Sequence, residues 1–279
     1  MKSVRDLLGN AAIRLGGGDA RLEAELLLAH ALGQSRAWLY AHADDDVGQG
    51  AGIRFERLVT RRASGEPIAY LTGRREFWSL ELDVTSDVLI PRPETELLVE
   101  LALTRIPVDR DCAIADLGTG SGAIALALAH ERPRARVLAT DASAAALAVA
   151  RGNARRLDIT NVAFAQGEWC AALGSARFDL IASNPPYIES GDPHLGEGDL
   201  RYEPASALAS GSDGLDAIRA IVAAAPAYLA HGGSLLLEHG WDQAALVRAL
   251  LEARGLRGVQ SRRDGAGHER VTLGQAQSA

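Results

Sequence analysis

From Ala113 onward, short hydrophobic stretches alternate with longer amphipathic ones. The short stretches predict β-strands and the longer ones predict helices. Regular alternation of this kind is typical of a parallel sheet covered by helices on both faces. The strand candidates are AIADL, RVLATD, VAFAQG, FDLIAS and SLLLEHG, followed by two final strands around a Gly-rich turn in LRGVQSRRDGAGHERVTLG. We therefore expect an α/β fold with a doubly wound, mostly parallel, seven-stranded sheet.

A helical pattern precedes this alternation. Residues 1–70 carry apolar positions at helical spacing, which predicts a small bundle. The clearest run is ARLEAELLLAHALG, where Asp19 stands just before the run and Gly33 is its last residue. These residue types are preferred at the two ends of a helix.

The segment between the two patterns predicts a β-hairpin linker over residues 71–90. It contains a turn signal at Thr72–Gly73 and the alternating stretch FWSLELDV. Pro91 and Pro93 then stiffen the start of another helix. The expected organisation is a helical bundle over 1–70, the hairpin, and a catalytic domain over 91–279.

Composition and charge limit the possible functions. The net charge of the 279 residues is −7, and 47% of them are hydrophobic, as in an ordinary soluble protein. The longest apolar runs are too short for a bilayer, and the polar start MKSVRDLLGN lacks the core of a signal peptide. We expect a cytoplasmic monomer without a membrane partner. Cys112 and Cys170 have no metal-ligand spacing and predict buried, reduced thiols, with no metal site.

The positive charge is concentrated toward the N-terminal end, while the rest of the chain carries the acidic excess. This region is either a solvated helix face or a contact surface for an RNA-bearing partner, and the sequence leaves both open. The arginines concerned are Arg54, Arg57, Arg61, Arg62, Arg74 and Arg75.

The segment ADLGTGSGA predicts a ligand-binding loop between a strand and a helix. Its glycines permit a tight turn and close approach to a ligand, and Asp141 ends the next strand, where a carboxylate binds ribose hydroxyls. The candidate residues of the loop are Gly118, Thr119, Gly120, Ser121 and Gly122. GTGSGA also satisfies the dinucleotide fingerprint, so a nicotinamide enzyme stays an alternative on these residues alone.

Asp116, two residues before the first glycine, favours a different ligand. We expect its charge at the mouth of the loop, where it would repel a pyrophosphate and suit a ligand with an ammonium and a sulfonium group. The pattern D-x-G-x-G-x-G thus resembles the S-adenosylmethionine loop of class I methyltransferases.

The stretch SNPPYIES, which begins at the last residue of the strand FDLIAS, predicts an acceptor site. Amide and amino nitrogens are poor nucleophiles because their lone pair is delocalised, so positioning is the protein's main contribution. The side-chain oxygen of Asn184 can accept one N–H of an –NH₂ group, and the carbonyl of Pro185 can accept the other. Pro185 and Pro186 restrict the backbone, and Tyr187 offers an aromatic wall.

Several motifs together resemble the peptide chain release factor glutamine methyltransferases: GEPIAYLTGRREFWSLELDV, LIPRPETELLVE, DLGTGSGAIALALA, SNPPYI and EPASALASGSDGLDAIR. The resemblance runs from about Ala63 to Val271 and implies a Rossmann-like class I methyltransferase domain. It implies methyl transfer from S-adenosylmethionine, with S-adenosylhomocysteine as product. The acceptor would be the side-chain amide nitrogen of the glutamine in the Gly-Gly-Gln motif of class I release factors.

The resemblance also implies roles for single residues. Asn184 to Tyr187 would hold the glutamine amide, with Asn184 also bordering the cofactor. Gly118 to Gly122 would cradle the methionine part, Asp141 would bind ribose, and Trp169 would border the adenine. The roles of the PRPET segment stay open, and we assign no catalysis to His194 or His239.

Three alternatives can be weighed on the sequence. An adenine N6-methyltransferase acting on nucleic acid would use the same NPPY chemistry. It needs a basic groove, whereas this catalytic part is acidic, so we expect no sequence-specific nucleic acid partner. A nicotinamide oxidoreductase gives NPPY no task. A nucleoside-binding protein without activity also leaves the intact tetrad unexplained.

Overall fold

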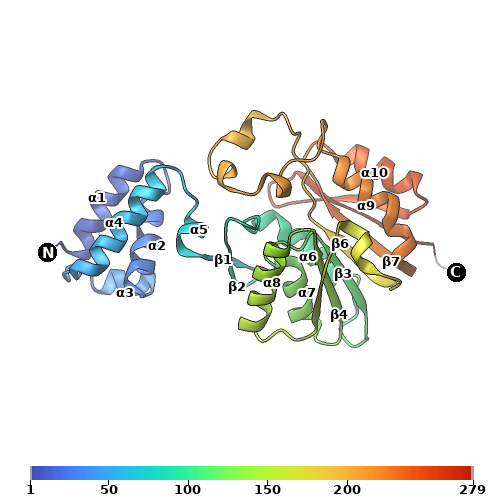
Figure 1. Cartoon of the computed structure of the whole chain (residues 1–279), viewed down its shortest axis with the longest axis horizontal. Helices are drawn as coiled ribbons and strands as arrows, with labels where there is room; N and C mark the ends of the chain where they lie inside the picture. Colours follow the sequence, from blue (N-terminus) through green and yellow to red (C-terminus); the bar gives the residue numbers. More distant parts are fainter. Residues whose placement is uncertain (1, 278–279) are drawn as a thin grey trace. The chain divides into compact units, whose positions relative to one another are not determined.

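The structure is a computed structural model that describes residues 2–277. The chain divides into two compact units, one ending at Arg74 and one starting at Arg75. Figure 1 shows the elements of both. The boundary falls four residues after the end of the predicted bundle, and the β-hairpin belongs almost wholly to the second unit.

The first unit consists of helices packed around their own core. Ser3 caps the first helix through a reciprocal capping box with Asp6, and Gly33 ends the second in the left-handed conformation. Leu27, Leu28 and Phe55 are among the side chains buried between the helices. The helices are α1 (Val4–Leu15), α2 (Ala20–Leu32), α3 (Arg36–Ala41), α4 (Gln49–Ala63) and α5 (Ile68–Thr72).

The hairpin forms, but the turn signal at Thr72–Gly73 belongs to the end of a helix. Gly73 stops α5 with a φ of 72°, and the strands β1 (Arg74–Phe77) and β2 (Leu80–Asp83) follow. The hairpin turn is made by Trp78 and Ser79, with φ values of 52° and 58°. A two-residue turn with both φ values positive matches the twist of the strands, although Gly and Asn are its usual residues.

The main sheet confirms the predicted mostly parallel, seven-stranded architecture. Its order is β5-β4-β3-β6-β7-β9-β8, and β9 runs antiparallel to both of its neighbours. The strands are β3 (Ala113–Leu117), β4 (Arg136–Asp141), β5 (Val162–Gln166), β6 (Phe178–Ser183), β7 (Leu229–Glu238), β8 (Arg257–Arg263) and β9 (Glu269–Gln275). After β3 the chain adds β4 and β5 on one side of this strand, and it then returns to add β6 and β7 on the other side. The switch point of the sheet therefore lies between β3 and β6.

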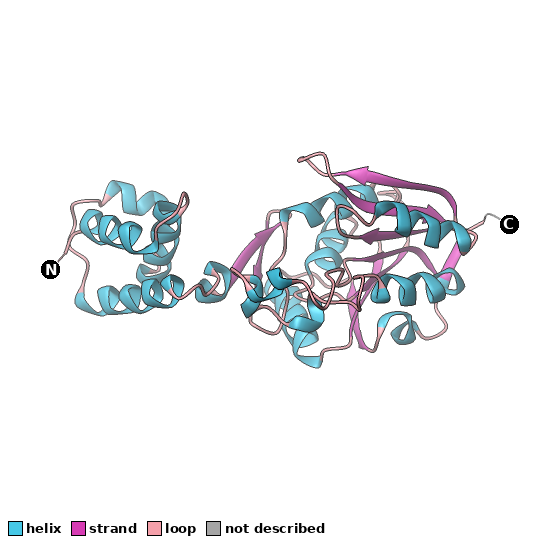
Figure 2. Ribbon diagram, turned by 90° about the horizontal axis from the view of Figure 1, so that it is seen from above, coloured by secondary structure: helices cyan, strands magenta, loops and turns pink. Residues whose placement is uncertain are grey.

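Helices cover both faces of this sheet, as Figure 2 shows. Successive strand residues point to opposite faces, so Leu180 packs into one core and Ile181 into the other. The core around Leu180 receives residues from α6 (Glu96–Leu103) and α7 (Ala123–Glu131). The core around Ile181 receives residues from α9 (Asp216–Ala224) and α10 (Ala244–Ala253). The remaining helix of this unit is α8 (Ala144–Arg156).

The segment between β6 and α9 is irregular, as expected. Three short 3₁₀ turns follow the Asn184–Tyr187 corner, and Ile188 pairs with Ala209 in a parallel bridge that closes the loop. The turns are η3 (Pro193–Gly196), η4 (Leu200–Tyr202) and η5 (Ala205–Ala207). Elsewhere, η1 (Pro93–Thr95) precedes α6, η2 (Trp169–Leu173) follows β5 and η6 (Ala225–Tyr228) precedes β7.

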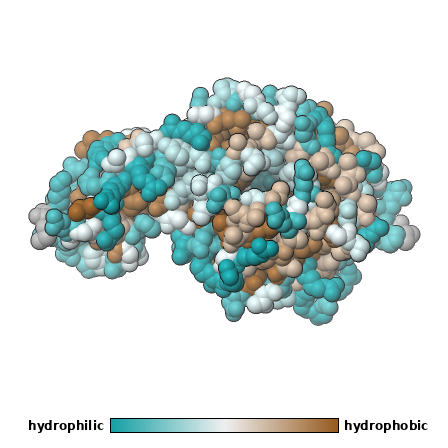
Figure 3. All heavy atoms as spheres, viewed as in Figure 1, coloured by the Kyte–Doolittle hydropathy of each residue, from teal (hydrophilic) through white to brown (hydrophobic). Residues whose placement is uncertain are grey.

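Between residues 2 and 277, the structure contains no helix with the length and apolar character needed to cross a membrane. Hydrophilic residues are spread over the face shown in Figure 3, mixed with hydrophobic ones. Cys112 and Cys170 are both buried and free.

Candidate active site

A cavity of about 460 Å³ lies beside the carboxyl ends of β3, β4 and β6. Open α/β sheets bind their ligands at this edge, next to the switch point. The walls bring together segments that are far apart in the sequence. They include Pro91, Arg92 and Thr95, Gly118 to Ser121, Asp141, Gly167 to Trp169, Asn184, Pro186 and Pro204.

The glycine loop approaches Trp169 closely. Gly118 has a φ of 71°, and a Cβ atom placed on it would lie 3.3 Å from Cζ3 of the Trp169 ring. Trp169 itself starts η2 with a φ of 45°, a conformation that favours glycine. The backbone of the loop and the indole thus form neighbouring walls of the cavity, and a side chain at position 118 would crowd them.

Asp141 is held in place by the backbone. Its Oδ2 accepts a hydrogen bond from the Gly120 N–H at 2.9 Å, and its Oδ1 accepts one from the Ser143 N–H at 2.8 Å. Each carboxylate oxygen has a further lone pair. The side chain therefore stands at the cavity wall in one orientation and can still accept hydroxyl groups of a ligand.

Asp116 does not lie at the mouth of the loop, contrary to our expectation. It is fully buried, and its Oδ2 accepts hydrogen bonds from the Thr119 hydroxyl at 2.6 Å and the Ala125 N–H at 3.1 Å. These bonds tie the loop to the first turn of α7. Its Oδ1 has no hydrogen-bond partner. Burial raises the pKa of Asp116 to about 7, although Thr119 and Ala125 act against this shift.

Asn184 has its side-chain amide oriented by the PRPET segment. Its Nδ2 donates to Oγ1 of Thr95 at 3.0 Å, and Thr95 is buried. The Oδ1 atom is thereby left as the free acceptor of the side chain. The preceding residue, Ser183, donates its hydroxyl to the carbonyl of Leu117 at 2.7 Å, which fixes the end of β6 beside the glycine loop.

The remaining residues of the predicted acceptor motif occupy different places. Pro186 lines the cavity, whereas Pro185 is buried and lines none of the cavities described here. Tyr187 lines a second cavity, and burial together with the charge of Glu238 raises the pKa of its phenol. Its backbone carbonyl accepts a hydrogen bond from Nε2 of Gln243 at 3.0 Å, which anchors the corner. Gly122 is also buried and lines neither cavity; it is the N-cap residue that precedes α7.

The second cavity has a volume of about 550 Å³ and shares Arg92 with the first. Glu238, at the end of β7, lines it and is 1% exposed. The Tyr187 hydroxyl donates to Oε1 of Glu238 at 3.4 Å, while Oε2 has no hydrogen-bond partner. Burial raises the pKa of Glu238 to about 7, against the effects of Thr95, Arg270 and Tyr187.

The structure shows what Arg92 binds, which the sequence leaves open. Its guanidinium donates to Oε1 of Glu203, whose side chain is fully buried. Oε2 of Glu203 accepts a hydrogen bond from the Ile90 N–H at 3.0 Å. Glu203 thus anchors the PRPET segment against the long loop after β6.

Sequence reasoning missed three residues of the site: Thr95, Glu203 and Glu238. A weak signal exists for Glu238, since it is the only charged residue of SLLLEHG and ends a buried strand at the ligand-binding edge. Thr95 and Glu203 lie in two of the motifs that carry the resemblance, LIPRPETELLVE and EPASALASGSDGLDAIR, but the residues themselves indicate no role there.

The two histidines that we left without a role have ordinary partners. His239 is buried, with its ring nitrogens 2.7 Å from Oγ1 of Thr272 and 2.8 Å from the Gly240 carbonyl, and burial lowers its pKa. His194 is exposed on the wall of the second cavity, and its hydrogen bond with Asp192 raises its pKa.

Comparison with known proteins supports first the class of protein and then the family. The fold and the cavity define a methyltransferase with a Rossmann-like domain, and residues 93–196 match the family model of the methyltransferase small domain. Residues 6–73 match the model of the PrmC N-terminal domain. A Thermus thermophilus 16S rRNA N2 G1207 methyltransferase, solved with AdoMet and guanosine, has the same fold. The TM-score is 0.54 with 22% identity, over 73% of this chain and 50% of that one.

Sequence relatives identify the family. A release factor glutamine methyltransferase from Xylella fastidiosa is 56% identical over 255 residues, which cover 91% of this chain and 93% of the relative. One from Yersinia pestis is 52% identical over 269 residues, covering 96% of this chain and 97% of the relative. The chain belongs to the release factor glutamine methyltransferases.

Proposed function

We propose that the chain transfers a methyl group from S-adenosylmethionine to the side-chain amide nitrogen of glutamine in the Gly-Gly-Gln motif of class I peptide chain release factors. The products are N5-methylglutamine and S-adenosylhomocysteine. The observation that carries this proposal is the orientation of Asn184. Because Thr95 takes the Nδ2 atom, Asn184 offers an oxygen to an incoming –NH₂ group, beside the glycine loop.

The first cavity fits the cofactor. Gly118 provides a backbone surface that a Cβ atom would obstruct, Asp141 retains lone pairs for ribose hydroxyls, and Trp169 offers a flat wall for a purine. Gly118, Thr119, Gly120 and Ser121, which line the cavity, would hold the methionine part, while Gly122 would only shape the start of the helix behind them. Asp116 would support that loop from below through its bonds to Thr119 and Ala125. When bound, S-adenosylmethionine supplies an electrophilic methyl group on a sulfonium.

The protein's contribution is to place the amide nitrogen of the acceptor. Asn184 Oδ1 would accept one N–H of the glutamine amide, and the Pro185 carbonyl would accept the other. Tyr187 would form an aromatic wall for the flat amide, and Pro186 would hold the backbone. Two fixed acceptors direct the nitrogen lone pair at the methyl carbon, which is the orientation that an in-line displacement requires. The product's extra proton passes to water.

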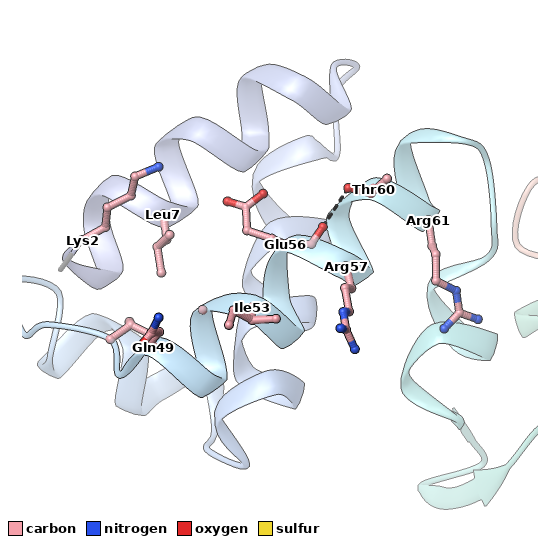
Figure 4. A pocket seen from close by; sticks show the side chains of 10 residues that line it. Lys2, Leu7, Gln49, Ile53, Glu56, Arg57, Thr60 and Arg61 are labelled. Carbon is pink, nitrogen blue, oxygen red and sulfur yellow. Dashed lines mark hydrogen bonds between the residues drawn. The ribbon is translucent and has the colours of Figure 1, made fainter.

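The first unit is the proposed contact for the rest of the release factor. It carries an open groove of about 950 Å³ beside α4, shown in Figure 4. The exposed Ile53 and Arg57 line this groove together with Arg61. Of the predicted arginines, Arg61 pairs with Glu66 and Arg62 with Glu23. Arg57 is therefore the better probe of this surface than either paired residue.

The test incubates the purified protein with labelled cofactor and either a release factor or duplex DNA. We expect label in the release factor, at the glutamine of its Gly-Gly-Gln motif by mass spectrometry. Label in DNA alone would overturn the proposal in favour of adenine N6-methylation. The two relatives described above are release factor glutamine methyltransferases, which argues against that outcome. The enzyme would act in the cytoplasm as a monomer, and size-exclusion chromatography with light scattering would test the oligomeric state.

A further inference from the structure

Two residues of the acceptor corner connect to one buried carboxylate. Tyr187 donates its hydroxyl to Oε1 of Glu238 at 3.4 Å. Thr95 accepts a hydrogen bond from Nδ2 of Asn184 at 3.0 Å, and its side chain is one of the groups that lower the pKa of Glu238. Glu238 therefore stands behind both the amide and the aromatic ring of the corner, although it is 51 residues further along the chain than Tyr187.

We propose that Glu238 is a positioning residue for the acceptor: through Thr95 it sets which atom of the Asn184 amide faces the substrate, and through the hydroxyl it holds the Tyr187 ring. This inference rests on the proposed function, since it concerns the same acceptor site. It also gives the PRPET segment a task, because Thr95 is the last residue of that motif.

The argument is one of hydrogen-bond polarity. An ionised carboxylate only accepts hydrogen bonds, so in the proposed arrangement the Thr95 hydroxyl turns its proton toward Glu238. The Thr95 oxygen is then an acceptor for Asn184 and binds Nδ2 rather than Oδ1. Oδ1 of Asn184 is left for the N–H of a substrate amide. If Glu238 were neutral and donated to Thr95, the threonine hydroxyl could instead donate its proton to Asn184. The Asn184 amide would then flip, and its N–H group would face the N–H group of the substrate amide.

The surroundings allow Glu238 to change charge near neutral pH. Arg270 on β9, together with the hydroxyls of Thr95 and Tyr187, favours the ionised form, whereas burial and Glu94 oppose it and raise the pKa to about 7. Arg92 and His194 line the same cavity. A buried carboxylate with one oxygen unpaired is costly in an apolar interior, so a purely structural role would be served better by an amide or an apolar residue.

Four variants test the proposal. Glu238→Gln removes the purely accepting group with little change of shape. Thr95→Val removes the hydroxyl, and Thr95→Ser restores it. Glu100→Gln is the matched control, because it neutralises an exposed carboxylate on α6. Each is assayed with a Gly-Gly-Gln peptide for kcat and KM, and each is studied by NMR of the Asn184 side-chain amide without substrate.

We expect Glu238→Gln and Thr95→Val to lower kcat by about 10- to 100-fold, since the acceptor nitrogen is misplaced rather than unbound. Thr95→Ser should restore most of the kcat that Thr95→Val loses, and Glu100→Gln should keep wild-type kcat. In the wild type, kcat should rise as pH passes through about 7, and the Asn184 amide resonances should shift over the same range. Glu238→Gln should abolish this dependence in both measurements.

Asn184 resonances that do not change with pH, together with wild-type kcat in Glu238→Gln, would overturn the inference. The NMR measurement does not depend on enzymatic activity. It therefore decides the inference even if Glu238→Gln is too unstable for kinetics, because Thr95→Val must then remove the pH response of the Asn184 amide resonances. An inactive wild-type enzyme whose Asn184 amide still responds to Glu238 would refute the proposed function and leave the positioning relationship standing.

Discussion

The guanidinium of Arg92 pairs with the carboxylate of Glu203, which is fully buried and lies 111 residues further along the chain. The other oxygen of Glu203 accepts the Ile90 N–H. One side chain of the long loop thus fixes the PRPET segment, and with it Thr95 and Asn184 at the cavity wall.

Removing Glu203 should therefore destabilise the second unit. We expect Glu203→Ala to lower the free energy of unfolding by about 3 kcal/mol, because the arginine and the Ile90 N–H both lose their partner. Glu203→Gln keeps an acceptor for the N–H and should cost clearly less. Urea denaturation measures both, and equal losses in the two variants would show that the ion pair with Arg92 contributes nothing.

Asn184→Ala should separate methyl transfer from cofactor binding. The variant loses the acceptor for the glutamine N–H, so we expect kcat to fall by about 100-fold or more. The glycine loop and Asp141 are unchanged, so calorimetry should give nearly the wild-type Kd for S-adenosylmethionine. If cofactor binding disappears together with activity, Asn184 serves the cofactor and not the acceptor.

Gly118→Ala should disturb the first cavity. The residue has a φ of 71°, and the new methyl group would meet the Trp169 ring at 3.3 Å. We expect the variant to be less stable by about 1–3 kcal/mol and to bind S-adenosylmethionine more weakly. Gly152→Ala is the control: it lies within α8 with open space at its Cβ position, and should gain about 0.5–1 kcal/mol. Undiminished cofactor binding in Gly118→Ala would place the ligand elsewhere.

The buried Asp116 should make stability depend on pH. Its folded pKa of about 7 lies above the ordinary value of 3.8, so folding favours the protonated form. The associated stability is complete below the unfolded pKa and is lost as pH rises through about 7. Relative to Asp116→Asn, the wild type should lose a few kcal/mol as the pH rises from about 4 to about 7 and little more above that, as measured by urea unfolding. The contribution of Glu238 cancels because both proteins contain it. A pH-independent difference would contradict the raised pKa.

Arg57→Glu should affect the whole release factor but not a short peptide. If the groove beside α4 contacts the body of the factor, the reversed charge should raise KM for the intact protein several-fold and leave KM for a Gly-Gly-Gln peptide unchanged. Arg5→Glu, on the exposed surface of α1 outside that groove, is the control. An unchanged KM for the intact factor would exclude this surface.

Much of the fold is predictable because its signals are local. Alternating strands and helices indicate the parallel sheet, and Gly118 and Asp141 fall at strand ends where the pattern places them. The hairpin turn escapes prediction because Trp78 and Ser79 adopt positive φ values that their residue types rarely show. The place of β9 between β7 and β8 is equally hidden, since hydrophobicity alone does not specify which strands pair.

The site is predictable only where residues cluster in the sequence. Asn184 to Tyr187 form one such cluster, but their supports lie far away: Thr95 is 89 residues before Asn184, and Glu238 is 51 residues after Tyr187. For Asp116 the sequence predicts a contact with the ligand that the structure does not show. Its position before the glycines suggests a role facing the ligand, whereas the turn of the backbone directs the carboxylate under the loop.

The antiparallel strand β9 has a consequence for synthesis of the chain. It fills the gap between β7 and β8, pairing Val271 with Glu238 and supplying Arg270 to the second cavity. A nascent chain that ends before Glu269 leaves β7 with an open edge and the carboxylate of Glu238 without its neighbouring guanidinium. Translation must therefore proceed beyond this strand before the acceptor pocket is finished, and a premature stop codon between β7 and β9 should yield an inactive, aggregation-prone fragment.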